Sequence, residues 1–338
     1  MPILVTGATG RIGANLVKGL VDAGHRVRAL ALPGDARVSK LQGLDVEIVY
    51  GTVAYREDVA EAMRGVEAVY HLAGVMTAPW TPPQLFDGNI RGMFNLLEEA
   101  RAHGRLRRFI WSSTDAVYEK YIPGGMTAAI DQDVTPRRPA DLYSMSKAVG
   151  EEMAAAYQRG WGVPVVTFRF PVVLAGDEAL TFWEFWLEPV LARARAGAAR
   201  GDAAAARAVA QLESLGAGAP RLLLARDEAG VPYRRHPADV RDIVQALLLA
   251  LTAEAAVGET IQLAGPEPWD YDRAIPLLSA ALGVPAVEAR LPGVPTRYWH
   301  DIGKARRLLG YAPVYDLPAT IASAVAFRAG DRQGVIGL

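Results

Sequence analysis

The sequence contains no cysteine, and its charges almost cancel, since 36 lysines and arginines stand against 37 aspartates and glutamates. The absence of cysteine excludes disulfides, thiolate catalysis and cysteine metal sites. A net charge of −1 gives no overall attraction toward nucleic acid or an anionic membrane. No apolar run reaches the length that spans a bilayer. We therefore expect a cytoplasmic protein whose partner is a small molecule, with no metal, nucleic acid or membrane bound.

Short apolar runs alternate with helical patterns through the first half of the 338 residues. This alternation predicts an α/β fold with a parallel sheet and helices on both faces, because a crossover helix returns the chain between parallel strands. Strands are expected at residues 3–5, 27–32, 46–50, 68–73, 109–114, 165–170 and 260–263.

The first strand runs directly into a glycine-rich turn and then into a helical pattern, Val5-Thr6-Gly7-Ala8-Thr9-Gly10-Arg11-Ile12-Gly13. A strand, a glycine-rich turn and a helix together present free backbone N–H groups and a helix N-terminus to a phosphate. Gly7 permits the sharp turn, Gly10 the approach of a pyrophosphate, and Gly13 the close packing of helix on strand. The turn predicts a dinucleotide site at the first strand-to-helix junction.

Tyr143 and Lys147 lie four residues apart in a helical segment, so their side chains share one face. A phenol with a pKa of about 10 is a poor base at neutral pH, but a neighbouring ammonium and an oxidised nicotinamide both favour the phenolate. The pair can therefore act as acid and base between an alcohol and a carbonyl. The alternative is a buried tyrosine and a solvent-exposed lysine on an ordinary helix. Hydroxyls at 112–114 close the fifth strand, whose carboxyl end faces the ligand crevice of such a sheet.

With these motifs the chain resembles the extended branch of the short-chain dehydrogenase/reductase superfamily, which contains epimerases, dehydratases and reductases. The resemblance implies a doubly wound parallel Rossmann sheet with a smaller, mostly helical C-terminal substrate domain. The matching segments run in the family's order over nearly the whole chain, at Thr6–Gly13, Tyr70–Gly74, Asn89–Gly92, Ser112–Tyr118, Tyr143–Lys147, Phe168–Phe170 and Asp301–Ala305.

The regular alternation of strands and helices ends near Gly176. We expect residues 1–176 to form the dinucleotide-binding domain, completed by 236–264, and residues 177–235 and 265–338 to form the substrate domain with a helical insert. Two or three helices are expected over 178–218, a hairpin between 222–225 and 231–235, and two helices in the tail. The aromatic block at 182–186 is expected as a helix packed on the sheet, with a lid over the substrate as the alternative.

The resemblance also implies roles for single residues. Tyr143 becomes the catalytic acid/base, Lys147 lowers its pKa and binds the nicotinamide ribose, and Thr114 orients the substrate oxygen, with Ser113 as the alternative if the register shifts by one. Asn89 supports the site or caps a helix. The implied cofactor-binding residues are Gly7, Thr9, Gly10, Arg11, Ile12, Gly13, Arg37, Leu72, Ala73, Gly74, Asn89, Tyr143, Lys147 and Phe170.

Three histidine and aspartate positions also match the family near the site. The simpler interpretation of His71 is a buried histidine whose hydrogen bonds are satisfied by neighbours in the core. His236 and Asp239 match a stretch near the substrate cleft, although Asp239 could equally cap the helix that it opens.

The adenosine end of the site departs from the family pattern. Enzymes that prefer NAD usually carry an acid at the end of the second strand, where this chain has Ala31 or Leu32. Asp35 comes several residues later, and Arg37 and Lys40 follow it. We therefore expect NADP or NAD as the cofactor, with a slight lean to NADP.

The substrate end departs as well. Pro171 stands where many nucleotide-sugar members have an asparagine, which weakens the case for a nucleoside diphosphate, although Arg234, Arg235, Arg290 and Arg297 could clamp an anion. We expect an NAD(P)-dependent oxidoreductase that interconverts a secondary alcohol and a ketone on a small, sugar-like substrate. The alternatives are a sugar or nucleotide-sugar epimerase or dehydratase with tightly bound NAD, and a non-catalytic dinucleotide sensor. The resemblance further implies a homodimer.

Overall fold

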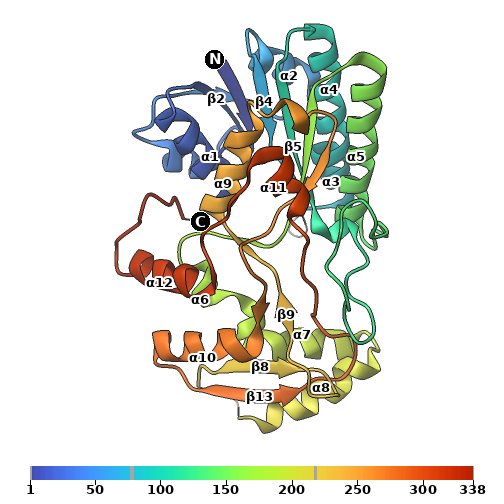
Figure 1. The fold of residues 1–338 in the computed structure, drawn as a ribbon, viewed down its shortest axis with the longest axis vertical. Helices are drawn as coiled ribbons and strands as arrows, with labels where there is room; N and C mark the ends of the chain where they lie inside the picture. Colours follow the sequence, from blue (N-terminus) through green and yellow to red (C-terminus); the bar gives the residue numbers. More distant parts are fainter. Residues whose placement is uncertain (1, 77–79, 217–218, 338) are drawn as a thin grey trace.

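Seven parallel strands form the central sheet of this chain, whose computed structural model describes residues 2–76, 80–216 and 219–337. Neighbouring strands are parallel throughout. The sheet confirms the expected α/β, doubly wound Rossmann fold, and it fills the upper part of Figure 1. In spatial order the strands are β3 (Val46–Tyr50), β2 (Arg26–Ala31), β1 (Pro2–Thr6), β4 (Ala68–His71), β5 (Arg108–Thr114), β6 (Val165–Phe170) and β11 (Thr260–Gln262).

Helices cover both faces of the sheet. One face carries α1 (Arg11–Asp22), α9 (Val240–Ala250) and α11 (Gly303–Leu309), and the other α2 (Arg56–Met63), α4 (Gly92–His103) and α5 (Leu142–Trp161). The sequence produces this layering because side chains alternate along a strand. In β1, Ile3 and Val5 join the core under α1, whereas Leu4 joins the core under α4.

A second unit lies beyond the carboxyl ends of the strands, in the lower part of Figure 1. It has its own apolar core around Phe185, Leu212 and Leu223. The split of the chain into two domains near Gly176 stays a prediction. The elements that follow β6 outside the main sheet are β7 (Val173–Leu174), α6 (Glu178–Thr181), α7 (Leu187–Ala199), α8 (Ala203–Ser214), β8 (Leu222–Arg226), β9 (Arg234–Arg235), β10 (Ala238–Asp239), β12 (Trp269–Asp270), α10 (Tyr271–Leu282), β13 (Ala286–Arg290) and α12 (Leu317–Arg328).

The expected hairpin between 222–225 and 231–235 is only partly correct. The turn forms, since the backbone N–H of Asp227 donates to the oxygen of Val231. The two flanking strands then part, because β8 pairs in parallel with β13 and β9 pairs antiparallel with β12. Strand β13 lies far along the chain, so local sequence signals could not reveal this partner. The tail beyond Pro266 holds three helices, α10, α11 and α12, rather than the expected two.

The aromatic block at 182–186 is not the helix that we expected. It contains a single 3₁₀ turn, Trp183–Phe185. Phe185 is 1% exposed and packs against Trp269 and Tyr271, with ring centroids 6.4 and 5.1 Å away. The block therefore helps to build the core of the second unit, rather than lying on the main sheet.

The last described residues return to the first helix. The side-chain amide of Asn15 in α1 donates to the oxygen of Ile336 at 2.8 Å, and the N–H of Ile336 donates back to the Asn15 oxygen at the same distance. No helix within the described ranges is both long and apolar enough to cross a membrane.

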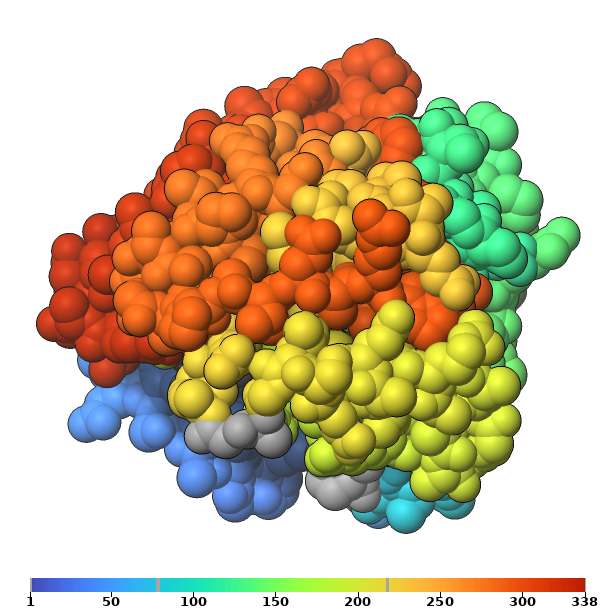
Figure 2. Space-filling view, turned by 90° about the horizontal axis from the view of Figure 1, so that it is seen from below, coloured from blue at the N-terminus to red at the C-terminus, as the bar shows by residue number. Residues whose placement is uncertain are grey.

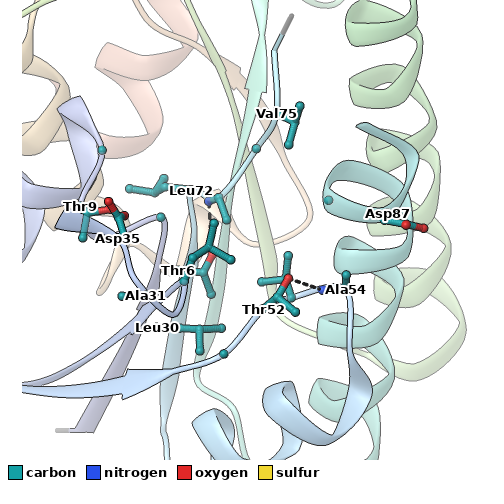
Figure 3. A pocket seen from close by; sticks show the side chains of 18 of the residues that line it. Thr6, Thr9, Leu30, Ala31, Asp35, Thr52, Ala54, Leu72, Val75 and Asp87 are labelled. Atoms are coloured by element: carbon teal, nitrogen blue, oxygen red, sulfur yellow. Dashed lines mark hydrogen bonds between the residues drawn. The ribbon is translucent and has the colours of Figure 1, made fainter. Parts of the chain in front are cut away.

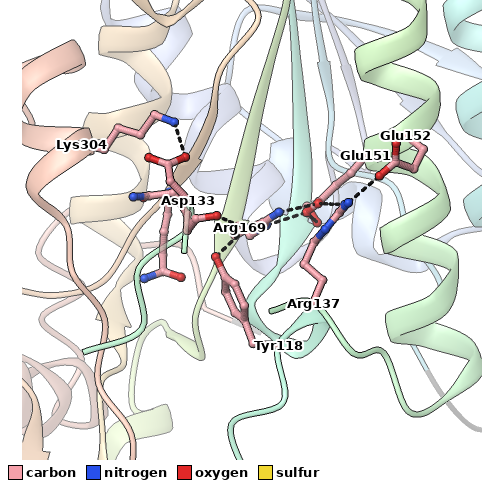
Figure 4. Close-up of polar contacts among 10 residues, drawn as sticks. Tyr118, Asp133, Arg137, Glu151, Glu152, Arg169 and Lys304 are labelled. Carbon is pink, nitrogen blue, oxygen red and sulfur yellow. Dashed lines mark hydrogen bonds and ion pairs between the residues drawn. The ribbon is translucent and has the colours of Figure 1, made fainter. Parts of the chain in front are cut away.

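Helix α5 is fixed to the sheet by one buried carboxylate, Glu151 (Figure 4). It accepts hydrogen bonds from Ser113 at the end of β5 at 2.6 Å and from the Arg169 guanidinium in β6 at 2.7 and 2.8 Å. Arg137 adds a further bond at 2.8 Å. Arg169 in turn donates to the hydroxyl of Tyr118 at 2.6 Å. These contacts set the height and rotation of α5 against β5 and β6.

We predict that Glu151→Gln destabilises the protein by about 3–5 kcal/mol, because it leaves the buried Arg169 guanidinium without a carboxylate. The neighbouring Glu152→Gln is the control, since the Glu152 side chain is 64% exposed; its effect should stay within about 0.5 kcal/mol. Urea unfolding measures both. Equal losses in the two variants would show that the buried pair does not anchor α5.

Candidate active site

A cleft of about 400 Å³ opens where β1, β2, β3 and β4 end (Figure 3). Residues at the ends of β1 and β2 and just after β3 and β4 line it, among them Thr6, Leu30, Thr52 and Leu72. Ligands of doubly wound sheets bind at this carboxyl edge, beside the glycine turn. The cleft is therefore placed where the sequence predicts a dinucleotide.

The glycine turn has the close approaches that we expected of it. Gly7 has φ +70°, a conformation that residues with side chains rarely adopt, and an added Cβ would lie 2.6 Å from the backbone nitrogen of Ala73. At Gly13 an added Cβ would lie 2.0 Å from the oxygen of Gly7. Both positions therefore require glycine, and α1 starts directly beside the turn. This geometry fits a pyrophosphate held by backbone N–H groups.

The structure corrects our placement of the acid at the adenosine end. We expected no carboxylate here, because Ala31 and Leu32 end the second strand. However, the chain turns after Pro33-Gly34 and brings Asp35 to the wall of the cleft, where it accepts a hydrogen bond from Thr9 Oγ1 at 2.7 Å. Hydrogen bonds from the side chain of Arg37, with a smaller contribution from Thr9, lower the Asp35 pKa to about 2. A charged carboxylate thus faces the cleft at neutral pH, and it holds Arg37.

The predicted cofactor residues divide into two groups. Arg11 is paired with Glu178, since it donates to both carboxylate oxygens at 2.5 and 2.6 Å. Ile12, Gly13, Asn89, Tyr143, Lys147 and Phe170 do not line this cleft, although several border it. The predicted residues that line the cleft are Gly7, Thr9, Gly10, Arg37, Leu72, Ala73 and Gly74. Trp80 and Gln84 also line it and were missed, because the only signal was the proline-rich composition of their segment.

The three hydroxyls at the end of β5 point in alternate directions, as residues of a strand must. Ser112 donates to the backbone oxygen of His71 at 3.2 Å, and Ser113 donates to Glu151. Thr114 Oγ1 accepts a bond from Ala116 N–H at 3.2 Å, which leaves its hydroxyl hydrogen available to another partner. The structure thus supports Thr114 over Ser113 as the hydroxyl that faces a substrate.

Tyr143 and Lys147 lie in the first two turns of α5, which starts at a capping box formed by Asp141 and Ser144. Burial raises the pKa of Tyr143 to about 12, and a hydrogen bond with Thr114 opposes this. Burial also lowers the pKa of the Lys147 ammonium to about 8. The phenol is therefore protonated in the free protein at neutral pH. The influence of the Thr114 hydroxyl on the pKa of Tyr143 places the two predicted catalytic groups close to each other.

Lys147, Asn89 and Gly74 meet at the edge of the cleft. An added Cβ on Gly74 would lie 3.2 Å from Lys147 Nζ and 3.6 Å from Asn89 Oδ1. Lys147 donates to the oxygen of Ser112 at 2.8 Å, and an ammonium has two further N–H donors to offer. Asn89 is no helix cap. Its Oδ1 accepts a hydrogen bond from the backbone N–H of Val75, and its side-chain amide donates to the backbone oxygen of Val75, both at 2.7 Å. The same amide donates to Ser146 at 2.9 Å. Asn89 thus positions the segment after β4 against α5.

The other candidates have structural partners. His71 Nδ1 lies 2.8 Å from Thr6 Oγ1 in the core, as we expected of a satisfied histidine. His236 is buried, bonded to the oxygen of Gly265 and to the N–H of His300, both at 3.0 Å. Asp239 caps α9 by accepting from Arg241 N–H.

Three of the four arginines that could clamp an anion are already paired with a carboxylate. Arg234 contacts Asp270 at 2.6 Å, Arg297 contacts Asp227 at 3.0 Å, and the buried Arg235 forms two short bonds to Glu184. Arg290 is exposed.

Comparisons with known proteins place the chain in a family. The model of the NAD dependent epimerase/dehydratase family matches residues 3–264. The sterol demethylase protein B of Methylococcus capsulatus is 36% identical over 187 residues, so that the match spans only about half of each protein, 55% of this chain and 53% of the relative. An uncharacterized UDP-glucose epimerase of Bacillus subtilis is 25% identical over 99% of this chain and its own full length.

A solved structure agrees with these matches. A short-chain dehydrogenase/reductase superfamily protein from Agrobacterium tumefaciens, with bound NAD, shares 30% identity and a TM-score of 0.83 over 98% of both chains. The expected superfamily is thus confirmed, whereas the lean to NADP is not. The chain belongs to the NAD-dependent epimerase/dehydratase family, whose members are enzymes of the extended short-chain dehydrogenase type.

Proposed function

We propose that the protein is a dehydrogenase or ketoreductase that moves hydride between NAD and a secondary alcohol or its ketone. The observation that carries this proposal is the meeting of Thr114 and Tyr143 beside Lys147, next to a cleft shaped for a dinucleotide. A non-catalytic sensor has no use for this acid/base pair. Both members of the pair are present, with Lys147 buried and Tyr143 half-buried, which supports catalysis.

The paired arginines favour net oxidation or reduction over nucleotide-sugar epimerisation. A nucleoside diphosphate needs cations that are free to bind its phosphates, and Arg234, Arg235 and Arg297 are held by carboxylates. The relatives carry names that indicate two different substrates, a sterol for the Methylococcus capsulatus protein and UDP-glucose for the Bacillus subtilis protein. The charge pairing in this chain supports the uncharged substrate.

The chain's own residues supply orientation and proton transfer, while the nicotinamide, when bound, supplies the hydride acceptor or donor. Thr114 donates its hydroxyl hydrogen to the substrate oxygen and holds it beside Tyr143. In the oxidation direction the phenolate of Tyr143 takes the alcohol proton, and in reduction the phenol returns it. Lys147 binds the ribose with its spare N–H donors, and its charge favours the phenolate.

Tyr143→Phe tests this mechanism. We expect kcat to fall by about 10²–10⁴, because the proton-transfer group is lost, while NADH binding measured by fluorescence stays within threefold of the original Kd. Tyr157→Phe is the control on the same helix, since its hydroxyl contacts Glu98 away from the cleft. More than one tenth of the original activity in Tyr143→Phe would refute the mechanism.

We further propose NAD as the cofactor. The Asp35 carboxylate can accept hydrogen bonds from the two hydroxyls of the adenosine ribose and repels a 2′-phosphate. Asp35 also holds Arg37, the cation that a 2′-phosphate would otherwise meet.

Asp35→Ser should therefore lower the ratio of kcat/KM for NAD to that for NADP by at least tenfold, since it removes the repulsion and frees Arg37. Steady-state kinetics with both cofactors measures the ratio. Asp45→Ser, an exposed aspartate outside the cleft, should leave the ratio unchanged. An unchanged ratio in Asp35→Ser would show that this carboxylate does not select the cofactor.

A homodimer is our proposal for the assembly. Large apolar side chains are exposed on α4 and α5, namely Phe94, Leu142 and Met145 at 47%, 47% and 41%. Sedimentation equilibrium should show a dimer that Met145→Glu converts to a monomer, whereas Val134→Glu, on an exposed loop, keeps it. A monomeric original protein would contradict this assembly.

A further inference from the structure

A buried ion pair forms at the residue that follows Thr114 in the chain. This residue, Asp115, opens the 3₁₀ turn Asp115–Val117, and the backbone N–H of Tyr118 donates to the Asp115 backbone oxygen at 3.2 Å. The ammonium of Lys120 lies 2.5 Å from Asp115 Oδ2, and both side chains are at most 7% exposed. The pair therefore closes the loop by which the chain leaves β5.

A segment far along the chain packs against this pair. The ring of Tyr298 lies under the ammonium of Lys120, 4.5 Å from the ring centroid, and His300 Nε2 lies 3.2 Å from Asp115 Oδ2. Both of these later residues are buried. In Figure 2, which looks onto the second unit, its yellow and orange segments cover most of the face beyond the sheet. The charges of the pair are therefore screened much less than charges on the surface.

The cluster of Asp115, Lys120 and His300 carries no net charge at neutral pH. Burial alone would raise the pKa of Asp115, but the ammonium of Lys120 and the ring of His300 outweigh this effect and hold the pKa well below its usual range. Burial lowers the pKa of His300, although Asp115 opposes this, so the ring is uncharged. One carboxylate thus balances one ammonium.

The cluster is close enough to Tyr143 to act on its proton. Burial raises the pKa of Tyr143 most, the hydroxyl of Thr114 lowers it, and the charges of Asp115 and Asp141 raise it. Lys147 lies on the same face of α5. The titratable groups that face Asp115 are those of Lys120, His300, Tyr118, Tyr143 and Tyr298. Within this set, Lys120 carries the positive charge that Asp115 neutralises.

We propose that Asp115 is a positioning residue of the active site, which holds the turn after Thr114 through its ion pair with Lys120 and balances the charge of Lys120 beside Tyr143. The proposal rests on the proposed function, since Tyr143 is the acid and base of that reaction. Without the carboxylate, the ammonium of Lys120 would favour the phenolate of Tyr143. The phenol that returns a proton during ketone reduction would then be depleted.

Asp115→Asn tests this charge balance. ¹³C NMR of ring-labelled tyrosine in the NAD-loaded protein measures the pH at which Tyr143 ionises, and loss of the signal in Tyr143→Phe assigns it. We expect the midpoint to fall by at least about 0.5 pH unit, because a unit charge acts over several ångströms at an effective dielectric constant of about 20. The double variant, Asp115→Asn with Lys120→Met, removes both charges and should restore the original midpoint. Glu119→Gln, which changes an exposed acid beside Lys120, should leave the midpoint unchanged.

The titration needs no turnover, so it separates failure of this inference from failure of the proposed function. An unchanged midpoint in Asp115→Asn overturns the inference and leaves the dehydrogenase assignment standing. A shift that the double variant does not reverse also overturns it, because the shift then comes from a disturbed fold. A reversed shift in a protein that oxidises no member of a panel of secondary alcohols supports the charge balance and overturns the assignment. If Asp115→Asn unfolds, a folded double variant supports the balance, and an unfolded one overturns it.

Discussion

The burial of Glu151 is the constraint on which the chemistry of this protein depends. Tyr143, Lys147 and Glu151 follow one another at four-residue spacing, so they lie on one face of α5. By holding Arg169 and Ser113, Glu151 fixes that face against β5 and β6. The same bond occupies the hydroxyl of Ser113. The carboxylate thus determines both where the tyrosine stands and which hydroxyl of β5 is left to meet it.

In the second unit, most of the buried or half-buried arginines form ion pairs with a carboxylate. Arg234, Arg235 and Arg297 come from one stretch of the fold and find partners in segments far apart in sequence, Asp270, Glu184 and Asp227. Each of these three arginines thus lies against a carboxylate, which balances its charge within the protein.

Periodicity and turn chemistry made most of the fold predictable. The seven strands of the sheet and the glycine turn follow from local patterns of a few residues, and the catalytic pair from its helical spacing. What the sequence could not show depends on distant contacts. Strand β13 is the partner of β8 although Leu223 pairs with Val287, which lies 64 positions further along the chain. Asp35 reaches the cleft only because Pro33-Gly34 turns the chain, and the arginines pair with carboxylates that no local sequence pattern predicts.

The contact between Asn15 and Ile336 has a consequence for how the chain is made. Its two hydrogen bonds join residues 321 positions apart, so helix α1 gains its final contacts only after nearly the whole described chain has left the ribosome. Strand β11, which completes the sheet, is also synthesised late. The helix that follows the cofactor turn is thus translated long before the residue that completes its contacts.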